Sequence, residues 1–513
     1  MKLHGAAICA VLLVGIFYVV TLRQGHSWGD DFSMYIRHAK NLVEGVNYAE
    51  TDYIYNPEHS IAPTTYPPIF PLLLSPIYRW YGLNLQVMKL EGIVFFVMSL
   101  YLIFMIFKDD LSNLYILPAL LLVGMNPFFW DQKDAIGSDL AFMLFTYLSL
   151  YLICKEFPRT PHNSGGLGRS FVIGLPTYLS YGTRSLGILL VPSLLIYDFI
   201  KNRWIGRVSI HVSLIFLFLV IIQSVFLHTD NSYASQFLHT QHLPTTIARN
   251  FRMYAITLYD FYSSDIFFNS YINILTTISV LTLTAILAVT GFISRAKNYV
   301  TIIEIFVPLY LITVVLWPFW EGLRFLLPVI PFYFLYIFVG INSINTALHH
   351  QIRNILSFGV ILLLVVIYVF QYSKMNFAII HDGIAQKESI ELFDYVKAKT
   401  HPHAVFIFVK PRALSLFTGR RAAINHRPRD DVVLWNFFRE IHATYLIVGP
   451  PGPLVGSSLI QDVALSLHPT TSVFSRGELR FLQQFVAKYP DDFQEVYTNA
   501  VFQVYQIHHN YSD

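Results

Sequence analysis

The chain has little charge and almost no cysteine. Only 13% of its 513 residues are Asp, Glu, Lys or Arg, about half the share found in soluble domains. The two cysteines, Cys9 and Cys154, lie within hydrophobic stretches, which excludes a disulfide framework or a cysteine-built metal site as an organising element. The sequence also lacks a Lys/Arg cluster and a nucleotide-binding loop, so nucleic acid and nucleotides are not expected partners.

Hydrophobic residues dominate the sequence instead. They make up 54% of the chain, and apolar runs of roughly 18 residues or more, long enough to cross hydrocarbon, recur before residue 373. We therefore predict a polytopic α-helical membrane protein with about eleven spans. The predicted spans are 4–22, 86–107, 114–130, 138–154, 170–182, 185–200, 208–227, 271–293, 300–318, 324–344 and 354–372.

The first apolar run fits either a signal peptide or an uncleaved anchor. It extends from Gly5 to Leu22 and follows Met1–His4. We favour the anchor, because the run has about 18 residues and no small-x-small cleavage site follows it.

Cations concentrate in alternate short connections, and this predicts the orientation. With the N-terminus inside, every inner connection carries a Lys or Arg, as the positive-inside rule requires. The inner cations are Lys108, Lys155, Arg159, Arg169, Lys201, Arg203, Arg207, Arg295, Lys297 and Arg353. The long 23–85 and 228–270 loops and everything after about 373 then lie on the outer side.

Two helices that do not cross the membrane are expected in the first outer loop. Residues 32–45 predict an interfacial helix, because apolar and polar residues fall on opposite faces at helical spacing. The apolar face holds Tyr35, Ala39, Leu42 and Val43, and the polar face holds Arg37, His38, Lys40 and Asn41. Tyr66–Pro76 is too rich in proline for a straight span and favours a re-entrant helix. A further surface helix is expected within 228–270.

The composition changes after about residue 373, and we predict a C-terminal α/β domain over 373–513, after a transmembrane domain over 1–372. The patterns predict strands and helices in alternation, within the usual size range of a domain. The expected elements are helices at 388–399, 430–440, 455–467 and 476–488, strands at 404–409 and 444–448, and a hairpin of 495–498 with 501–506.

Three outer carboxylates are candidates for chemistry. Asp30 and Asp31 follow the first span, and Asp139 stands at the mouth of another. Ionisable residues at such a position usually face a cavity or a partner. Because Asp is also favoured at helix N-caps, a capping role for Asp139 stays open.

Two outer cations are the complementary candidates. Arg184 and Arg324 lie at span ends, against the positive-inside trend. Each either extends to the lipid headgroups or offers its planar fork to a lipid-linked phosphate. Carboxylates and cations on one membrane face suit a sugar on a lipid phosphate, because a carboxylate can act as base while cations stabilise the departing phosphate.

At these residues the sequence resembles the membrane glycosyltransferases of clan C, in particular the branch of protein O-mannosyltransferases and aminoarabinose transferases. The resemblance follows five short motifs between residues 1 and 345, in order. They are Asp31-Phe-Ser-Met-Tyr35 through Glu44-Gly45, Tyr66-Pro67-Pro68, Ser138-Asp139, Thr183-Arg184 through Pro192, and Arg324 through Pro328.

The resemblance implies a glycosyltransferase that uses a polyprenyl-phosphate-linked sugar at the outer face of a bacterial inner membrane. Its acceptor would be a protein, lipid or glycan. Asp31 would be the general base, Asp139 would help organise the substrates, and the remaining residues would bind donor phosphate or substrate. Those residues are Asp30, Tyr35, Tyr66, Arg184 and Arg324. No metal ligand is assigned, and a divalent metal is not implied.

Two positions depart from the family pattern. Phe32 stands where many relatives carry Glu, and Tyr66 replaces the Lys of the aminoarabinose branch. These departures question that branch's acceptor and leave Asp30 as either a second acid or a plain surface charge.

Two other classes of function remain as alternatives. A flippase or transporter would place ionisable residues near mid-bilayer and show symmetric halves. A non-catalytic assembly protein would present the outer domain with no cavity joining Asp31, Asp139 and Arg184. The family motifs favour the transferase.

Overall fold

A computed structural model describes residues 2–56, 65–156, 166–227, 243–263, 270–318, 320–344, 350–380, 383–424, 431–449 and 476–508. The chain forms two compact units. We call them the helical unit, built from Met1–Leu22, Met88–Phe226 and Thr240–Phe377, and the α/β unit, built mainly from Arg23–Val87 and Ala378–Asp513. The predicted boundary near residue 373 stays a prediction, although the first outer loop belongs to the same unit as the C-terminal residues.

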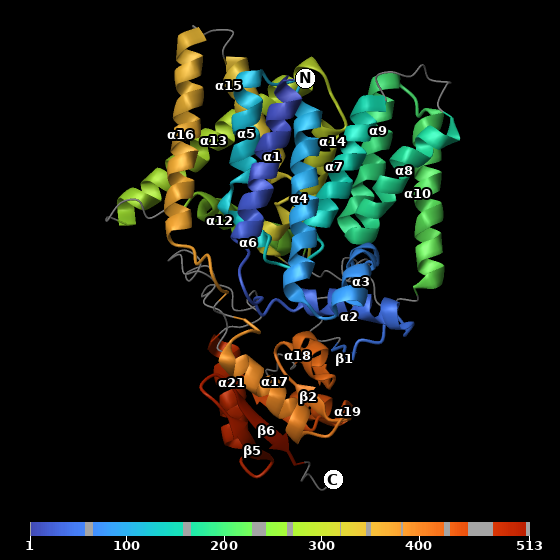
Figure 1. Ribbon diagram of the computed structural model, residues 1–513, viewed down its shortest axis with the longest axis vertical. Coiled ribbons are helices and arrows are strands. Elements are labelled where there is room, and N and C mark those ends of the chain that lie inside the picture. The colour runs from blue at the N-terminus through green and yellow to red at the C-terminus, as the bar shows by residue number, and fades with distance from the viewer. Residues whose placement is uncertain are drawn as a thin grey trace. The chain divides into compact units, whose positions relative to one another are not determined.

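The helical unit consists of long apolar helices (Figure 1). Six helices in the described part of the chain are long and apolar enough to cross a membrane, and three shorter apolar ones accompany them. Large apolar side chains are exposed along these helices, including Leu13, Phe218 and Leu362, as expected where a helix faces lipid. The protein is therefore an integral membrane protein, and the count of eleven spans stays a prediction.

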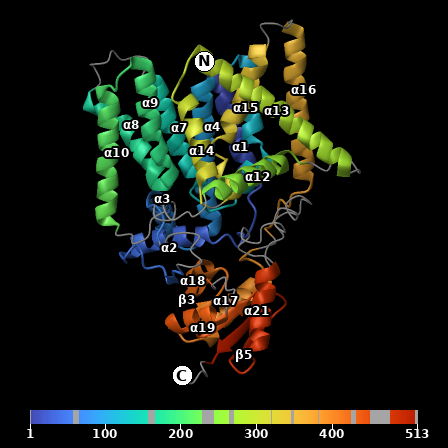
Figure 2. The same ribbon diagram turned by 180° about the vertical axis from the view of Figure 1, so that it is seen from behind.

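The helices of this unit come from three stretches of the chain. Their bounds are α1 Lys2–Val20, α4 Leu85–Phe107, α5 Asn113–Gly124, α6 Pro127–Gln132, α7 Asp139–Glu156, α8 Leu167–Thr183, α9 Leu190–Asn202, α10 Arg207–Phe226, α12 Leu243–Tyr262, α13 Ser270–Asn298, α14 Ile303–Leu316, α15 Ile330–Ile344 and α16 His350–Ser373. Figure 2 shows α12 lying crosswise to the long helices, which confirms the surface helix expected in 228–270. The rest of that loop, from 228 to 242 and from 264 to 269, lies outside the described residues.

Two glycines let α13 and α15 cross with their backbones in contact. A Cβ atom on Gly291 would stand 2.0 Å from the carbonyl oxygen of Tyr336, and one on Gly340 would stand 2.0 Å from that of Leu287. Small residues commonly permit such close helix crossings in membranes.

The structure refines two of the expected spans. The predicted span 114–130 is instead two helices, because Asn126 caps α6 by accepting a hydrogen bond from the Phe128 N–H and Pro127 begins the new helix. The interruption expected near Arg184 is confirmed, since α8 ends at Thr183 and a 3₁₀ helix, η3 (Ser185–Leu189), follows.

The α/β unit joins the first outer loop to the C-terminal region in one sheet. Its described strands run in the order β1-β3-β2-β4-β6-β5, with the first four parallel. β1 comes from the first outer loop and pairs with β3, Tyr53 opposite Ala422. The strands are β1 Tyr53–Ile54, β2 Val405–Ile407, β3 Arg421–Ala423, β4 Tyr445–Val448, β5 Phe493–Thr498 and β6 Gln503–Ile507.

Helices cover this sheet and flank the loop, and several match the sequence predictions. The helices are α2 Asp31–Glu44, α3 Ile69–Tyr81, α17 Lys387–Lys399, α18 Pro411–Thr418, α19 Asp431–Glu440 and α21 Arg476–Lys488. The hairpin of β5 and β6 is confirmed as an antiparallel pair. The sequence did not predict β1, β3 or α18, and the expected helix at 455–467 lies outside the described residues.

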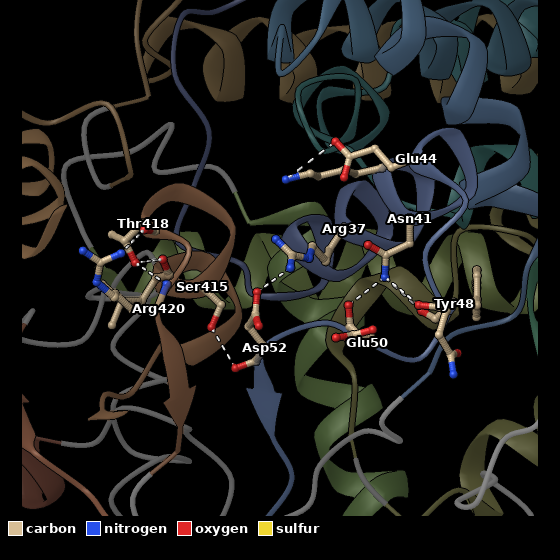
Figure 3. Close-up of polar contacts among 12 residues, drawn as sticks. Arg37, Asn41, Glu44, Tyr48, Glu50, Asp52, Ser415, Thr418 and Arg420 are labelled. Atoms are coloured by element: carbon tan, nitrogen blue, oxygen red, sulfur yellow. Dashed lines mark hydrogen bonds and ion pairs between the residues drawn. The ribbon is translucent and has the colours of Figure 1, made fainter. Parts of the chain in front are cut away.

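The expected burial of one face of α2 is partly wrong. His38 and Asn41, assigned to the polar face, are buried, whereas Leu42 is exposed. The returning chain explains this, because the Asn41 amide donates to the carbonyl oxygens of Asn47 and Glu50, at 3.0 and 2.7 Å (Figure 3). Buried polar groups are tolerated when they are hydrogen-bonded in this way.

Candidate functional site

Asp31, Tyr66 and Arg412 form an ionic cluster in the α/β unit. The Tyr66 hydroxyl donates to Asp31 Oδ1 at 2.6 Å and accepts a hydrogen bond from Arg412 Nη1, also at 2.6 Å. The same Nη1 lies 3.5 Å from Asp31 Oδ1. Asp31 therefore has a direct cationic partner and a second link to that cation through a hydroxyl. We call these three residues and Asp30 the carboxylate cluster.

Tyr66 is fixed in the carboxylate cluster by residues of α2 and of the following loop. His38 Nδ1 lies 2.8 Å from the Tyr48 carbonyl oxygen, and its Nε2 accepts from the Tyr66 N–H at 3.2 Å. This pattern requires a neutral imidazole with its proton on Nδ1. Burial lowers the pKa of His38 to about 3, and the Tyr35 ring packs 4.8 Å from the Tyr66 ring.

Asp30 completes the cluster at the beginning of α18. Its Oδ1 accepts a hydrogen bond from the Ala413 N–H at 3.1 Å, and its Oδ2 lies 3.6 Å from Arg412 Nε. Burial raises the pKa of Asp30, while Arg412 and Lys410 act in the opposite sense. Burial also lowers the pKa of Lys410. Asp30 is thus a partner of the C-terminal region rather than a plain surface charge.

In the carboxylate cluster the Asp31 side chain is partly exposed, whereas the Arg412 side chain is buried. The side chain of Asp31 is 36% exposed, whereas that of Arg412 is 8% exposed and stacks over the rings of Tyr53 and Tyr66. Charged groups are seldom so deeply buried without pairing. The accessible charge of this cluster is therefore a carboxylate.

Asp139, Arg184 and Arg324 form a second cluster in the helical unit. Arg184 Nη1 forms an ion pair with Asp139 Oδ1, and Arg324 Nε and Nη2 lie 3.2 and 3.1 Å from Asp139 Oδ2. Both carboxylate oxygens of Asp139 are therefore taken by guanidinium groups. We call these three residues the arginine cluster.

Local backbone features position the two arginines. Arg184 has extended backbone after α8, and Gly187 packs so closely that a Cβ there would lie 2.4 Å from the Tyr181 nitrogen. Arg324 lies in a 3₁₀ helix, η4 (Gly322–Phe325), which begins at a glycine with φ of 65°. The Phe325 ring lies 4.9 Å beneath the Arg184 guanidinium. A side chain at Gly187 would clash with the backbone of Tyr181, and one at Gly322 would be strained by the positive φ.

In the arginine cluster the two arginines are partly exposed, whereas the aspartate is buried. The side chain of Asp139 is fully buried, whereas those of Arg184 and Arg324 are 15% and 31% exposed. Asp139 is the first residue of α7, and in this geometry its carboxylate holds the two guanidinium groups. The accessible charge of this cluster is cationic.

The predicted site residues therefore fall into two groups. Asp30, Asp31, Tyr35 and Tyr66 lie together in the α/β unit, and the arginine cluster gathers the other three in the helical unit. Sequence reasoning missed Arg412 and Lys410. The available signal was a Lys-Pro-Arg sequence just after a buried strand, at the edge where parallel sheets hold functional residues.

No three His, Cys, Asp or Glu side chains in the described parts of the chain are close enough together to hold a metal ion.

The fold is similar to that of an archaeal oligosaccharyltransferase. The apo structure of the Archaeoglobus fulgidus enzyme aligns with a TM-score of 0.57 and 10% identity, covering 86% of this chain and 69% of that one. The same organism's oligosaccharyltransferase AglB, in complex with an inhibitory peptide and a dolichol-phosphate, aligns with a TM-score of 0.55 at 10% identity over the same shares.

A third structure matches over nearly the full length. ArnT from Cupriavidus metallidurans, bound to undecaprenyl phosphate, covers 99% of this chain and 98% of its own, with a TM-score of 0.41 and 12% identity. No protein-family model and no curated protein matches the sequence. The chain thus shares the fold of these oligosaccharyltransferase structures, and the motifs predicted a fold of this kind.

Proposed function

We propose that this chain is an integral-membrane glycosyltransferase that moves a single sugar from a polyprenyl phosphate to an acceptor. The transfer takes place on the extracytoplasmic face, in a bacterial inner membrane. The observation that carries this proposal is the arginine cluster of the helical unit, in which two guanidinium groups keep exposed surface around one buried carboxylate. Exposed guanidinium groups can stabilise the charge of a departing phosphate. The α/β unit, taken by itself, offers an accessible carboxylate, Asp31, which can take a proton.

In this proposal Arg184 and Arg324 bind the donor phosphate. Their guanidinium groups retain exposed surface although Asp139 holds one edge of each. The planar guanidinium fork matches phosphate oxygens and stays charged at all relevant pH values. Asp139 is then a positioning residue, because its buried carboxylate orients the arginines and offers no exposed atom to the substrate.

Asp31 is the general base of the proposed reaction. It takes a proton from an acceptor hydroxyl or amine as that atom attacks the anomeric carbon. The bond between this carbon and the phosphate oxygen breaks, its electron pair remains on the phosphate, and the arginines stabilise the added charge. A single displacement of this kind inverts the anomeric configuration.

The fold similarity supports the class of donor. The oligosaccharyltransferase AglB binds dolichol-phosphate, and the structure of the same organism's enzyme has been obtained with a tethered acceptor peptide. A polyprenyl phosphate suits a chain rich in membrane helices, because its tail partitions into the bilayer while its headgroup stays at the surface.

The test compares wild-type protein with Asp31→Asn in membranes that carry the endogenous acceptor. Radiolabelled undecaprenyl-phosphate mannose, glucose and aminoarabinose are supplied one at a time. Asn keeps the size of the side chain but cannot take the proton, so we expect transfer to fall by roughly 100-fold or more. Undiminished transfer would remove Asp31 from the role of base.

Asp52→Asn is the matched control for this experiment. Asp52 lies in the same loop and pairs with Arg37, and its main-chain oxygen accepts from Ser415 (Figure 3). Because it has a positive φ that Asn tolerates, the substitution keeps the local backbone. We expect transfer within about two-fold of wild type.

Lipid scrambling in liposomes without any sugar transfer by the wild type would instead indicate a flippase.

A further inference from the structure

The chain after β2 leaves the sheet where open α/β folds usually bind their ligands. β2 ends at Ile407, and the chain proceeds through α18 to β3 on one side, and only later to β4 on the other. Ligands of such sheets bind beyond the carboxyl ends of the strands, where the strand order reverses. Lys410 and Arg412 lie on this segment, and the side chains of Asp30 and Asp31 lie against it.

The Arg412 guanidinium connects all the acidic members of the carboxylate cluster. Nη1 donates to the Tyr66 hydroxyl and lies 3.5 Å from Asp31 Oδ1, and Nε lies 3.6 Å from Asp30 Oδ2. The rings of Tyr53 and Tyr66 lie 4.8 and 5.4 Å from its central carbon. These contacts leave Arg412 one well-defined position, which a lysine could not reproduce because it lacks the planar fork.

Several independent contacts keep the C-terminal region attached to the loop that carries Asp31. The Ala422 N–H donates to the Asp52 carbonyl oxygen at 3.0 Å, next to the pairing of β1 with β3. At the other end of the loop, the N–H of Ile384 donates to the carbonyl oxygen of His26 at 3.1 Å. The loop is therefore held at both ends, and Arg412 has a fixed base from which to reach Asp31.

We propose that Arg412 is a positioning residue for the general base Asp31, so that the C-terminal region completes the catalytic site. Arg412 orients the carboxylate directly and through the Tyr66 hydroxyl, and it favours the ionised form of Asp31, the form that can take a proton. This inference rests on the proposed function for its catalytic consequence only. The groups that face Asp31 are Asp30, Tyr66, Lys410 and Arg412.

The first test measures the ionisation of Asp31 and needs no sugar donor. Dicyclohexylcarbodiimide modifies protonated carboxyl groups, and fragment masses report the labelling of Asp31 as a function of pH. In Arg412→Gln, Asp31 loses its neighbouring cation, so its labelling should persist to a pH about one unit higher than in wild type. Arg412→Lys keeps the charge and should shift the profile less.

Arg420→Gln is the matched control, because it removes an arginine of the same unit that has different partners. Arg420 donates to the carbonyl oxygens of Lys397 and Thr400, and Figure 3 shows it beside Thr418. The pH profile of Asp31 labelling in Arg420→Gln should coincide with that of the wild type. Equal shifts in Arg420→Gln and Arg412→Gln, or no shift in Arg412→Gln, would overturn the proposal.

The second test measures transfer by the same variants with the radiolabelled undecaprenyl-phosphate sugars. Arg412→Gln should lower kcat by about 10-fold or more with a smaller change in KM, and the acidic limb of its pH profile should move upward. Tyr66→Phe removes only the bridging hydroxyl, and it replaces Arg412→Gln in this test if that variant does not fold. The acidic limb of its pH profile should move in the same direction by a smaller amount. Wild-type kcat and pH profile in both variants would overturn the inference.

The two tests separate this inference from the proposed function. If the wild type transfers none of the three sugars and yet the labelling shifts, the proposed function fails and the contact of Arg412 with Asp31 stands. If the wild type transfers sugar and the labelling profiles coincide, the inference alone fails.

Discussion

The arginine cluster holds two partly exposed guanidinium groups around a fully buried carboxylate, whereas the carboxylate cluster holds a partly exposed carboxylate beside a buried guanidinium. Both use Asp–Arg pairs, so residue type alone does not distinguish them. Their net charges differ, because one aspartate offsets two arginines in the first, while Asp30 and Asp31 are balanced by Lys410 and Arg412 in the second.

The difference shows how burial gives the same kind of ion pair opposite accessible charges. A buried partner is shielded from water and fixed in place, so it serves to orient the member that remains accessible. The accessible member then presents its charge to a substrate. The arginine cluster is thus suited to an anion and the carboxylate cluster to a group that gives up a proton.

Of the changes that test this comparison, removal of both exposed arginines should have the largest effect, a loss of phosphate binding. A hydrogen bond to a charged group contributes about 1.5–3 kcal/mol, so each arginine accounts for roughly 10-fold or more in phosphate affinity. We expect Arg184→Gln/Arg324→Gln to weaken binding of undecaprenyl phosphate by about 100-fold or more in nanodiscs. Arg203→Gln, at the end of α9, is the control; equal loss in both would show a nonspecific effect of charge.

Substitution of the buried acid should affect stability as well as binding. In Asp139→Asn the two arginines lose their common counter-ion, and because both guanidinium groups are partly solvated we expect a loss of about 1–3 kcal/mol. Unfolding of the helical unit in a denaturing-detergent titration measures it. Wild-type stability together with wild-type phosphate binding would show that Asp139 does not hold the arginines.

The pH dependence of the α/β unit should be the smallest effect at mildly acidic pH and should come from His38. Its pKa is lowered to about 3 in the folded protein and is about 6.5 when unfolded. Below pH 6.5 the unfolded chain thus binds one more proton than the folded protein. The contribution of neutral His38 to the free energy of unfolding is therefore complete above pH 6.5. It is lost as the pH falls towards 3, by up to about 1.4 kcal/mol per pH unit.

Hydrogen exchange of the α2 amides across this pH range measures that loss. His38→Gln keeps a donor and an acceptor without the titration, so its opening free energy should depend less on pH than that of the wild type. Parallel pH dependences in the two proteins would contradict the assignment of the titration to His38.

The sequence located several local elements well. The periodicity of 32–45 and Gly45 located α2, whereas the common outer face of Asp139, Arg184 and Arg324 stays a prediction from the charge pattern. The helix could be located because helical periodicity is a property of short segments.

Contacts between distant segments could not be read in this way. Nothing periodic connects Asp31 with Arg412, and β1 has only two residues, too few to show an alternating pattern. His38 was assigned to the polar face because its side chain is polar, whereas the fold satisfies it with backbone groups of Tyr48 and Tyr66. Which member of an ion pair is buried depends on packing that short patterns do not describe.

The most direct test of the central claim measures donor binding and turnover on the same nanodisc preparations of wild type, Asp31→Asn and Arg184→Gln/Arg324→Gln. The opposite exposure of the two clusters predicts that Asp31→Asn binds undecaprenyl phosphate like the wild type and transfers almost no sugar. The arginine double variant should lose affinity for undecaprenyl phosphate by about the same factor as it loses kcat/KM, measured at a limiting concentration of donor. Lost binding in Asp31→Asn together with intact binding in the arginine variant would contradict this account.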